Sequence, residues 1–263
     1  MIEHQNWIRV TRLQPCPVCH KPDWCASGER WINCMRVASD KPCKNGGWLH
    51  PVGDLPVNRP VQHQPDSPTK DFVGLLAGWT RNGLAAFAAT LGVKVEALEA
   101  MGCAWAEPYR AWAWPMRNGE WAVIGIRLRN DAGRKWAVRG SKQGLFCSSY
   151  PAAQTGFVCE GPTDTAAAIS IGLYAVGRPS CLGGTEHLKA LFKWKGVRRA
   201  VILADNDKPG IQGAQRLASE IGLPCALLVL PAKDTREFVQ MGGTRQMIET
   251  ILHETIWRNP SSS

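Results

Sequence analysis

The spacing of the cysteines constrains this chain more than any other feature. Five of its ten cysteines fall within 28 residues near the N-terminus, and the others are scattered singly. The first ten residues lack the apolar run of a signal peptide, and no apolar stretch is long enough to span a bilayer. Thiols stay reduced in a chain that is not exported, so the cluster indicates metal binding rather than disulfides. We therefore expect a cytoplasmic protein with an N-terminal metal module and no membrane partner.

Residues 1–51 have the pattern of a zinc ribbon. Cys16 and Cys19 form a metal knuckle with a two-residue spacer. Residues 24–27 and 30–34 read as a hairpin, which would return Cys34 to the knuckle. A module of this size has too small a core to fold unaided, so we expect structural zinc.

The sequence offers three candidates for the fourth zinc ligand. Cys43 and His50 both follow Cys34. Cysteine is the commoner partner in such sites, which favours Cys43, whereas His50 closes a short strand over residues 46–50. Cys25 lies further along the outgoing strand of the hairpin and ranks third.

The rest of the chain divides into a linker and two further parts. Residues 52–70 are rich in Pro, Asp, Asn and Gln and read as a linker. Apolar residues then recur at helical spacing over 71–101, with two short helices separated at Asn82-Gly83 and the second ended by Gly92. Residues 120–129 and 135–138 alternate as two strands around a turn at 130–133, which predicts a small antiparallel sheet.

From residue 156 the pattern becomes α/β. Apolar strands at 157–159, 173–176, 200–204 and 225–230 alternate with helices at 163–171, 186–192, 211–221 and 244–256. Such alternation predicts a parallel sheet covered on both faces. The expected fold class is thus α+β multidomain: a zinc ribbon (1–51), a linker (52–70), a helical and basic subdomain (71–154) and an α/β domain (155–258).

Carboxylates follow two of the predicted parallel strands. Glu160 ends the first strand, Asp164 lies one helical turn further on, and Asp205 and Asp207 follow the third strand. Ligands of an open parallel sheet bind beyond the carboxyl ends of its strands. Converging carboxylates repel one another unless a cation lies between them, and hard oxygen ligands suit Mg²⁺ or Mn²⁺.

This arrangement resembles the Toprim domain of bacterial-type primases, topoisomerases and some nucleases. The motif Glu-Gly-x-x-Asp at 160–164 is followed about forty residues later by Asp-x-Asp at 205–207, and the likeness spans about 156–241, with the loop 182–185 and Lys233-Asp234. The resemblance implies that Asp205 and Asp207 ligate magnesium, that Glu160 acts as acid/base or ligand, and that Asp164 supports them.

The preceding segment is similar to the basic subdomain of bacterial primases, in which a zinc ribbon reads template DNA. The residues that carry the likeness are 114–116, 123–129 and 135–146, and seven cations face two acids between 111 and 150. The primase resemblance implies a groove for template and nucleotide phosphates. The candidate phosphate-binding residues are Arg127, Arg129, Lys135, Arg139, Lys142 and Lys233. The chain most resembles the compact zinc-finger/Toprim proteins of phages and mobile elements. In those proteins the ribbon often ends with a strand closed as His50 closes the one here.

These features predict a primase-like nucleotidyltransferase. It would bind single-stranded DNA and make short RNA primers from ribonucleoside triphosphates with a divalent metal, with a replicative helicase as a candidate partner. The net charge of +9 agrees with a polyanionic partner. Two alternatives remain open: a Toprim nuclease that hydrolyses phosphodiesters with the same metals, and a non-catalytic DNA-binding replication protein.

Overall fold

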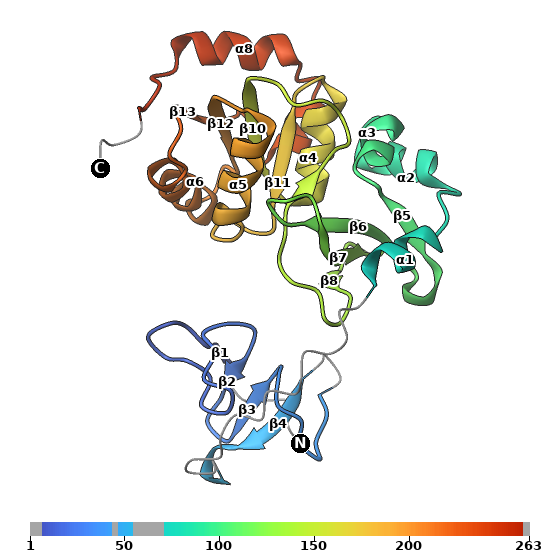
Figure 1. Cartoon of the computed structure of the whole chain (residues 1–263), viewed down its shortest axis with the longest axis vertical. Helices are drawn as coiled ribbons and strands as arrows, with labels where there is room; N and C mark the ends of the chain where they lie inside the picture. Colours follow the sequence, from blue (N-terminus) through green and yellow to red (C-terminus); the bar gives the residue numbers. More distant parts are fainter. Residues whose placement is uncertain (1–6, 44–46, 55–70, 260–263) are drawn as a thin grey trace. The chain divides into compact units, whose positions relative to one another are not determined.

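The chain forms two compact units that divide between residues 68 and 69. The computed structural model describes residues 7–43, 47–54 and 71–259 (Figure 1). Most of the expected linker, residues 55–70, lies outside these described ranges. In the described ranges, no helix is long and apolar enough to cross a membrane.

The N-terminal unit is a four-stranded antiparallel sheet in chain order. Its strands are β1 (Ile8–Arg9), β2 (Ala26–Ser27), β3 (Trp31–Cys34) and β4 (Trp48–Pro51), followed by the short 3-10 helix η1 (Val52–Asp54). The β2–β3 pair is the hairpin expected from the sequence. Among the described residues, its buried core cluster consists of four cysteines with Val10 and Ile32, because a module this small has few apolar residues to bury.

The second unit begins with three short helices and a four-stranded antiparallel sheet. The helices are α1 (Phe72–Ala77), α2 (Leu84–Leu91) and α3 (Val95–Ala100). The sheet has the order β5 (Ala104–Ala106), β6 (Ala111–Arg117), β7 (Val123–Arg129) and β8 (Lys135–Ala137), with the 3-10 helix η2 (Glu107–Tyr109) between β5 and β6. Gly92 ends α2 with a positive φ of 67°, as expected, and the β7–β8 pair confirms the predicted hairpin.

A five-stranded sheet forms the rest of this unit. Its order is β13 (Cys225–Val229), β12 (Arg199–Ala204), β10 (Thr155–Glu160), β11 (Ala175–Arg178) and β9 (Phe146–Cys147). The first four strands are parallel, which confirms the predicted α/β architecture. The helices are α4 (Gly161–Ser170), α5 (Thr185–Lys195), α6 (Lys208–Glu220), α7 (Thr235–Gln240) and α8 (Arg245–Glu254).

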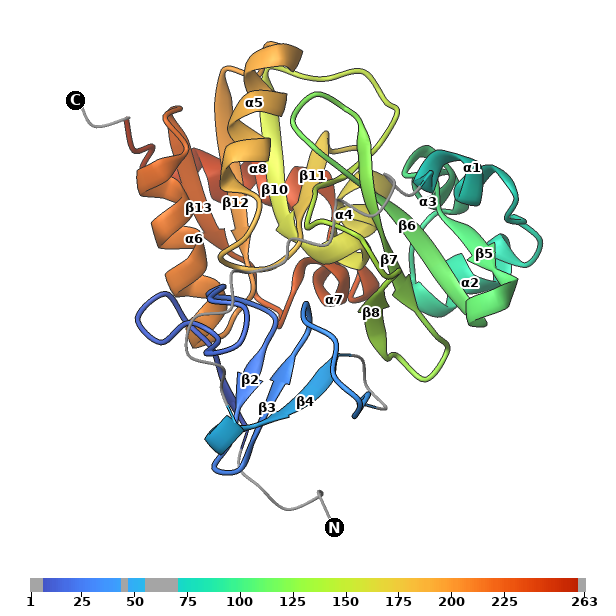
Figure 2. The same cartoon turned by 60° about the horizontal axis from the view of Figure 1, so that its bottom comes forward.

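Helices cover both faces of this sheet. Helices α4, α7 and α8 lie on one face and α5 and α6 on the other (Figure 2). Alternate strand residues pack on the two groups of helices. In β12, for example, Val201 and Leu203 face the first group of helices, whereas Ala200 and Ile202 face the second. The continuous apolar strands therefore follow from burial on both sides.

Helix α3 lies in the stretch 71–101 that was predicted to be helical. Short elements that the sequence pattern does not anticipate include β1, β5, α7 and the antiparallel edge strand β9. A helix of six residues and strands of two or three are too short to display a period, so only tertiary contacts define them.

Candidate active site and metal centre

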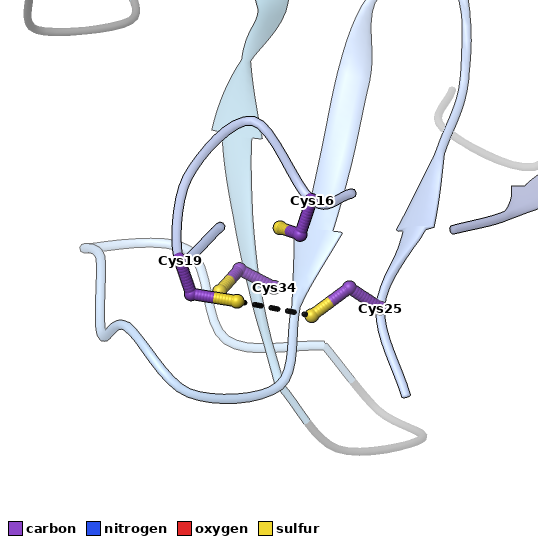
Figure 3. Close-up of side chains that lie close together, drawn as sticks. All are labelled: Cys16, Cys19, Cys25 and Cys34. Atoms are coloured by element: carbon purple, nitrogen blue, oxygen red, sulfur yellow. Dashed lines mark hydrogen bonds between the residues drawn. The ribbon is translucent and has the colours of Figure 1, made fainter. Parts of the chain in front are cut away.

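Four cysteine sulphurs meet beside the N-terminal sheet. The Sγ atoms of Cys16, Cys19, Cys25 and Cys34 all lie within 4.8 Å of one another, and all four residues are buried (Figure 3). Four sulphurs bound tetrahedrally to zinc at about 2.3 Å would lie about 3.8 Å apart. Four thiols are also the ligand set of many structural zinc sites. The residues therefore fit a bound Zn²⁺.

The fourth member of this cluster is Cys25, so the preference for Cys43 or His50 was wrong. In the β2–β3 register Ala26 pairs with Asn33, which places Cys25 directly beside Cys34 at the end of the hairpin. His50 instead pairs with Ile32, two residues before Cys34, and its Nε2 lies 3.0 Å from the Val37 carbonyl oxygen.

Cys43 also lies outside the four-sulphur group. Its backbone N–H donates to the Gly47 carbonyl oxygen, and the neighbouring Pro42 bridges to Trp48, so it lies along β4. In the structure the hairpin closes between residues 28 and 31, and this register pairs positions 25 and 34.

Hydrogen-bond donors surround the sulphurs. The backbone N–H groups of Met35 and Val37 donate to Cys25 and Cys34, each at 3.3 Å. The Arg36 guanidinium lies 3.9 Å from the sulphur of Cys19 and 3.8 Å from that of Cys25. Such donors stabilise thiolates, the form that binds metal.

The four thiols also perturb one another's ionisation. Hydrogen bonds with Cys16 and then Cys25 hold the pKa of Cys19 well below its usual range. Hydrogen bonds with Cys16 and then Cys19 raise the pKa of Cys25. Metal binding needs the thiolate form, so it would release the protons that these thiols still hold.

The predicted carboxylates lie at one edge of the parallel sheet. Glu160 is the last residue of β10, Asp205 directly follows β12, and Asp207 precedes α6. Because these strands are parallel, their carboxyl ends share an edge. The sequence analysis did not count Asp234 among the site acids, although it follows β13 on the same edge and precedes α7.

Local hydrogen bonds fix two of these acids. Asp207 accepts from the Gly210 N–H at 2.7 Å and Asp234 from the Glu237 N–H at 2.8 Å, so each caps a helix. Gly210 allows the close approach, because a Cβ there would lie 2.7 Å from the Asp205 carbonyl oxygen. Glu160 precedes α4 without a capping bond from its side chain, and Gly161 turns the backbone sharply with a φ of 66°.

Negative charge is in excess at this edge. Burial, followed by the charges of Glu160, Asp234 and Asp207, raises the pKa of Asp205 to about 7. Burial and the charges of Asp207 and Asp164 likewise raise the pKa of Glu160, although Arg178 opposes the shift. A bound cation would remove this repulsion.

The carboxylates at this edge do not enclose a metal ion by themselves. Among the described residues, only the four cysteines bring three or more His, Cys, Asp or Glu ligand atoms within 4.8 Å of one another. Mg²⁺ commonly binds one or two carboxylates and completes its shell with water and substrate phosphates. The donor types at this edge therefore fit Mg²⁺ or Mn²⁺ without a closed protein cage.

Asp164 lies deeper than the other acids. It is 8 % exposed and accepts a hydrogen bond from the Arg236 N–H at 3.0 Å, so it joins α4 to the first turn of α7. Burial, followed by the charge of Asp234, raises the pKa of Asp164 to about 7. This placement agrees with the supporting role expected for it.

The basic strand β7 lies close to the acids. Arg127 and Arg129 share one face of the strand, and Arg129 interacts electrostatically with Asp164 and Arg236. Burial lowers the pKa of both arginines, and the Nε of Arg127 is buried without a hydrogen-bond partner. Lys135, at the start of β8, offsets part of the pKa shift of Asp205. Two parts of the second unit thus contribute opposite charges to one region.

The other predicted cations occupy loops. Arg139 and Lys142 are exposed after β8, and the Lys142 N–H donates to the Ile124 carbonyl oxygen at 2.9 Å. Lys233 is exposed before α7, and its carbonyl oxygen accepts from Asn206 at 2.7 Å. This last bond ties the loops that follow β12 and β13.

Arg178 is a site residue that the sequence analysis missed. It ends β11 directly beside Glu160 in the parallel register and is only 4 % exposed. Its Nε donates to the Gly183 carbonyl oxygen at 2.8 Å, and its Nη2 donates to Thr185 Oγ1 at 3.3 Å. Arg178 therefore holds the Gly183-Gly184 loop next to Glu160. The sequence signal that could have revealed Arg178 is a cation at the end of an otherwise apolar strand.

A curated relative shows which family the chain belongs to. The Gene 57 protein of Mycobacterium phage D29 is 30% identical over 158 residues, which cover 57% of this chain and 98% of that protein. The chain belongs to the Gene 57 protein family. No protein-family model matches it.

Solved structures show the fold of this Gene 57 family member. An Aquifex aeolicus primase comprising zinc-binding and RNA polymerase domains is 14% identical, has a TM-score of 0.58 and aligns over 71% of this chain and 60% of its own. The E. coli primase catalytic core has a TM-score of 0.56 at 14% identity, over 70% of this chain and 79% of its own. A DnaG primase catalytic domain bound to single-stranded DNA has a TM-score of 0.57 at 14% identity, with 70% and 77% covered. The family member thus combines a four-cysteine unit with a primase catalytic-core fold, as the sequence predicted.

Proposed function

We infer that this protein is a primase-like nucleotidyltransferase that makes short RNA primers on single-stranded DNA. The observation that carries the inference is the carboxylate edge of Glu160, Asp205, Asp207 and Asp234 beside the basic strand β7. Burial and the neighbouring carboxylates raise the pKa values of Glu160 and Asp205 there. The fold shared with primase cores supports it, and one such core binds single-stranded DNA.

The residues divide into two groups by charge. Glu160, Asp205 and Asp207 would hold Mg²⁺ or Mn²⁺ through carboxylate oxygens, and the ion would neutralise charge on the reacting phosphate. Arg127, Arg129 and Lys135 would hold phosphates of template or nucleotide near that ion. Arg139, Lys142 and Lys233 would extend the same contacts. Asp164 would keep α4 and α7 in place, and Arg178 would keep the loop beside Glu160.

The zinc unit would contribute template recognition. Its four-cysteine cluster supports a bound structural zinc, and the similar Aquifex aeolicus structure also includes a zinc-binding domain. A replicative helicase stays a predicted partner.

Primer synthesis is the direct test. The full chain is incubated with single-stranded template, four ribonucleoside triphosphates and Mg²⁺, and labelled RNA is resolved by length. Asp205→Asn and Asp207→Asn each remove one negative charge, so we expect product to fall about a hundredfold or more with each. Asp131→Asn, in the exposed turn between β7 and β8, is the matched control and keeps full activity.

Three outcomes would contradict the proposal. Full activity in both variants would remove the carboxylates from the site. Metal-dependent cleavage of the DNA without RNA synthesis would make the protein a nuclease, and DNA that is bound but unchanged would make it a replication protein without catalysis.

A further inference from the structure

A second cationic and aromatic surface lies away from the carboxylate edge. It consists of Trp121, in the turn between β6 and β7, together with Arg117, Trp194 and Lys195. The ring centroids of the two tryptophans are 6.2 Å apart, with the planes tilted by 49°. We name these four residues the tryptophan platform.

The topology separates this platform from the proposed active site. Helix α5 runs from Thr185, after the carboxyl end of β11, to Lys195, before the amino end of β12. Its eleven residues span about 16 Å at 1.5 Å per residue. Trp194 and Lys195 therefore belong to the edge opposite Glu160 and Asp205.

Cations stack on both indole rings. The Arg117 guanidinium lies 4.6 Å from the Trp121 centroid, and Lys195 Nζ lies 4.7 Å from Trp121 and 4.4 Å from Trp194. Trp194 is nevertheless 58% exposed. An apolar protein partner favours an interface centre depleted of charge, which this platform does not offer.

The turn that carries Trp121 is built to hold it in place. Trp121 has a φ of 71°, a conformation that is strained for a bulky side chain. The Asn118 side chain accepts from the N–H groups of Glu120 and Ala122, and Arg117 Nη1 donates to the Trp121 carbonyl oxygen at 2.9 Å. Hydrogen bonds on both sides of Trp121 therefore maintain the strain.

The segment that carries Trp194 is strongly positive. Residues 185–199 contain one acid, Glu186, and five cations: Lys189, Lys193, Lys195, Arg198 and Arg199. A flat ring that stacks, next to cations that neutralise phosphates, matches a single-stranded polynucleotide. We propose that the tryptophan platform is a second binding surface for single-stranded DNA, which extends the strand path beyond the active site. The proposal rests on the proposed function in one respect: that function is the reason for choosing DNA as the polynucleotide.

Oligonucleotide length separates the two surfaces. Two fluorescently labelled single strands are titrated with the full chain by anisotropy. One has about 5 nucleotides, near the lower end of the usual 4–16-nucleotide site sizes, and the other has about 25, beyond the upper end. Because one stacked base is worth about 1–3 kcal/mol, Trp194→Ala should weaken binding of the long strand about fivefold or more. Binding of the short strand, which the cations of β7 and β8 can hold alone, should change less than twofold.

Matched variants test the chemistry. Trp194→Phe keeps a ring and should retain most of the affinity for the long strand. Lys195→Gln should reduce the slope of log affinity against log salt concentration for the long strand by roughly one, the value expected for one lost phosphate contact. The control is Arg245→Gln on α8, an equally large loss of charge at an exposed side chain on the other face of the sheet. Because Trp194 is exposed, its replacement leaves the core intact, which a thermal melt verifies.

Equal affinity of wild type and Trp194→Ala for the long strand would overturn the proposal, whether or not the variant loses binding to another protein. The outcome is independent of catalysis. If the wild type makes no RNA but Trp194→Ala selectively loses the long strand, the proposed function fails and the platform stands. If RNA is made and the variant binds like the wild type, only the platform fails.

Discussion

Asp164 shows how one buried side chain makes the fold sensitive to pH. Burial raises its pKa to about 7, so in the folded protein it stays protonated to a higher pH than in the unfolded chain. Between about pH 4 and pH 7 the folded state therefore binds more protons, and stability falls as the pH rises. Above pH 7 the carboxylate is charged in both states and the whole penalty remains.

Asp164→Asn should remove this penalty. Asparagine keeps an oxygen for the Arg236 N–H but carries no charge. In thermal melts without added divalent metal, we expect the variant to melt several degrees above wild type at pH 8, with the gap closing toward pH 4. A gap that is constant with pH, or a variant less stable at pH 8, would contradict the buried-charge explanation.

Cys25 is the second test at the scale of a residue. Cys25→Ser removes one of four sulphur ligands, whereas Cys43→Ser changes a cysteine outside the cluster. We expect the first variant to lose zinc and the second to retain one zinc per chain, as measured by metal analysis of the purified protein. The reverse result would restore Cys43 as the ligand.

At the scale of an element, strand β7 joins the basic subdomain to the acidic edge. Its alternation sends Ile126 and Leu128 to the core and Arg127 and Arg129 to the opposite face. Arg129 there interacts with Asp164, a contact between segments far apart in the chain. The strand therefore places cations where phosphates would approach the metal ligands.

Replacing Arg127 and Arg129 with glutamine should weaken binding to single-stranded DNA and flatten its salt dependence by roughly one unit per lost phosphate contact. The measurement is the slope of the logarithm of affinity against the logarithm of salt concentration. Arg134→Gln in the neighbouring exposed turn is the control for charge. An unchanged slope in the double variant would move the DNA path away from β7.

At the scale of the whole molecule, the chain is two units with different sources of stability. The second unit has two extended apolar cores on the faces of its parallel sheet. The described part of the first unit buries few apolar side chains besides its cysteines, so we expect its folding to depend on a bound metal.

Chelation should therefore separate the two units. With zinc removed, we expect the N-terminal unit to unfold while the second still melts cooperatively near its original temperature. Calorimetry with and without chelator, together with tryptophan fluorescence, measures both events. Cys16→Ser with Cys19→Ser should reproduce the effect, and a common loss of both transitions would show that the units fold together.

The sequence by itself determined the elements whose signals are local or periodic. The knuckle at Cys16 and Cys19, the hairpin that returns Cys34, and the apolar strands that end at Glu160 and before Asp205 depend on neighbouring residues and on burial. The alternation of apolar strands and helices predicted the α/β architecture, and the resemblance to the Toprim domain and to primases implied the primase-like fold.

Tertiary structure decided what depends on register and on contacts across the chain. The pairing of β2 with β3 selected Cys25 over Cys43, and the pairing of β10 with β11 set Arg178 beside Glu160. Asp234 joined the acids because β13 lies parallel to β12. Trp121 and Trp194, more than seventy positions apart, met through the packing of the β6–β7 turn on α5. The sequence around either residue of such a pair does not reveal its partner, because the two residues come together only when the chain folds.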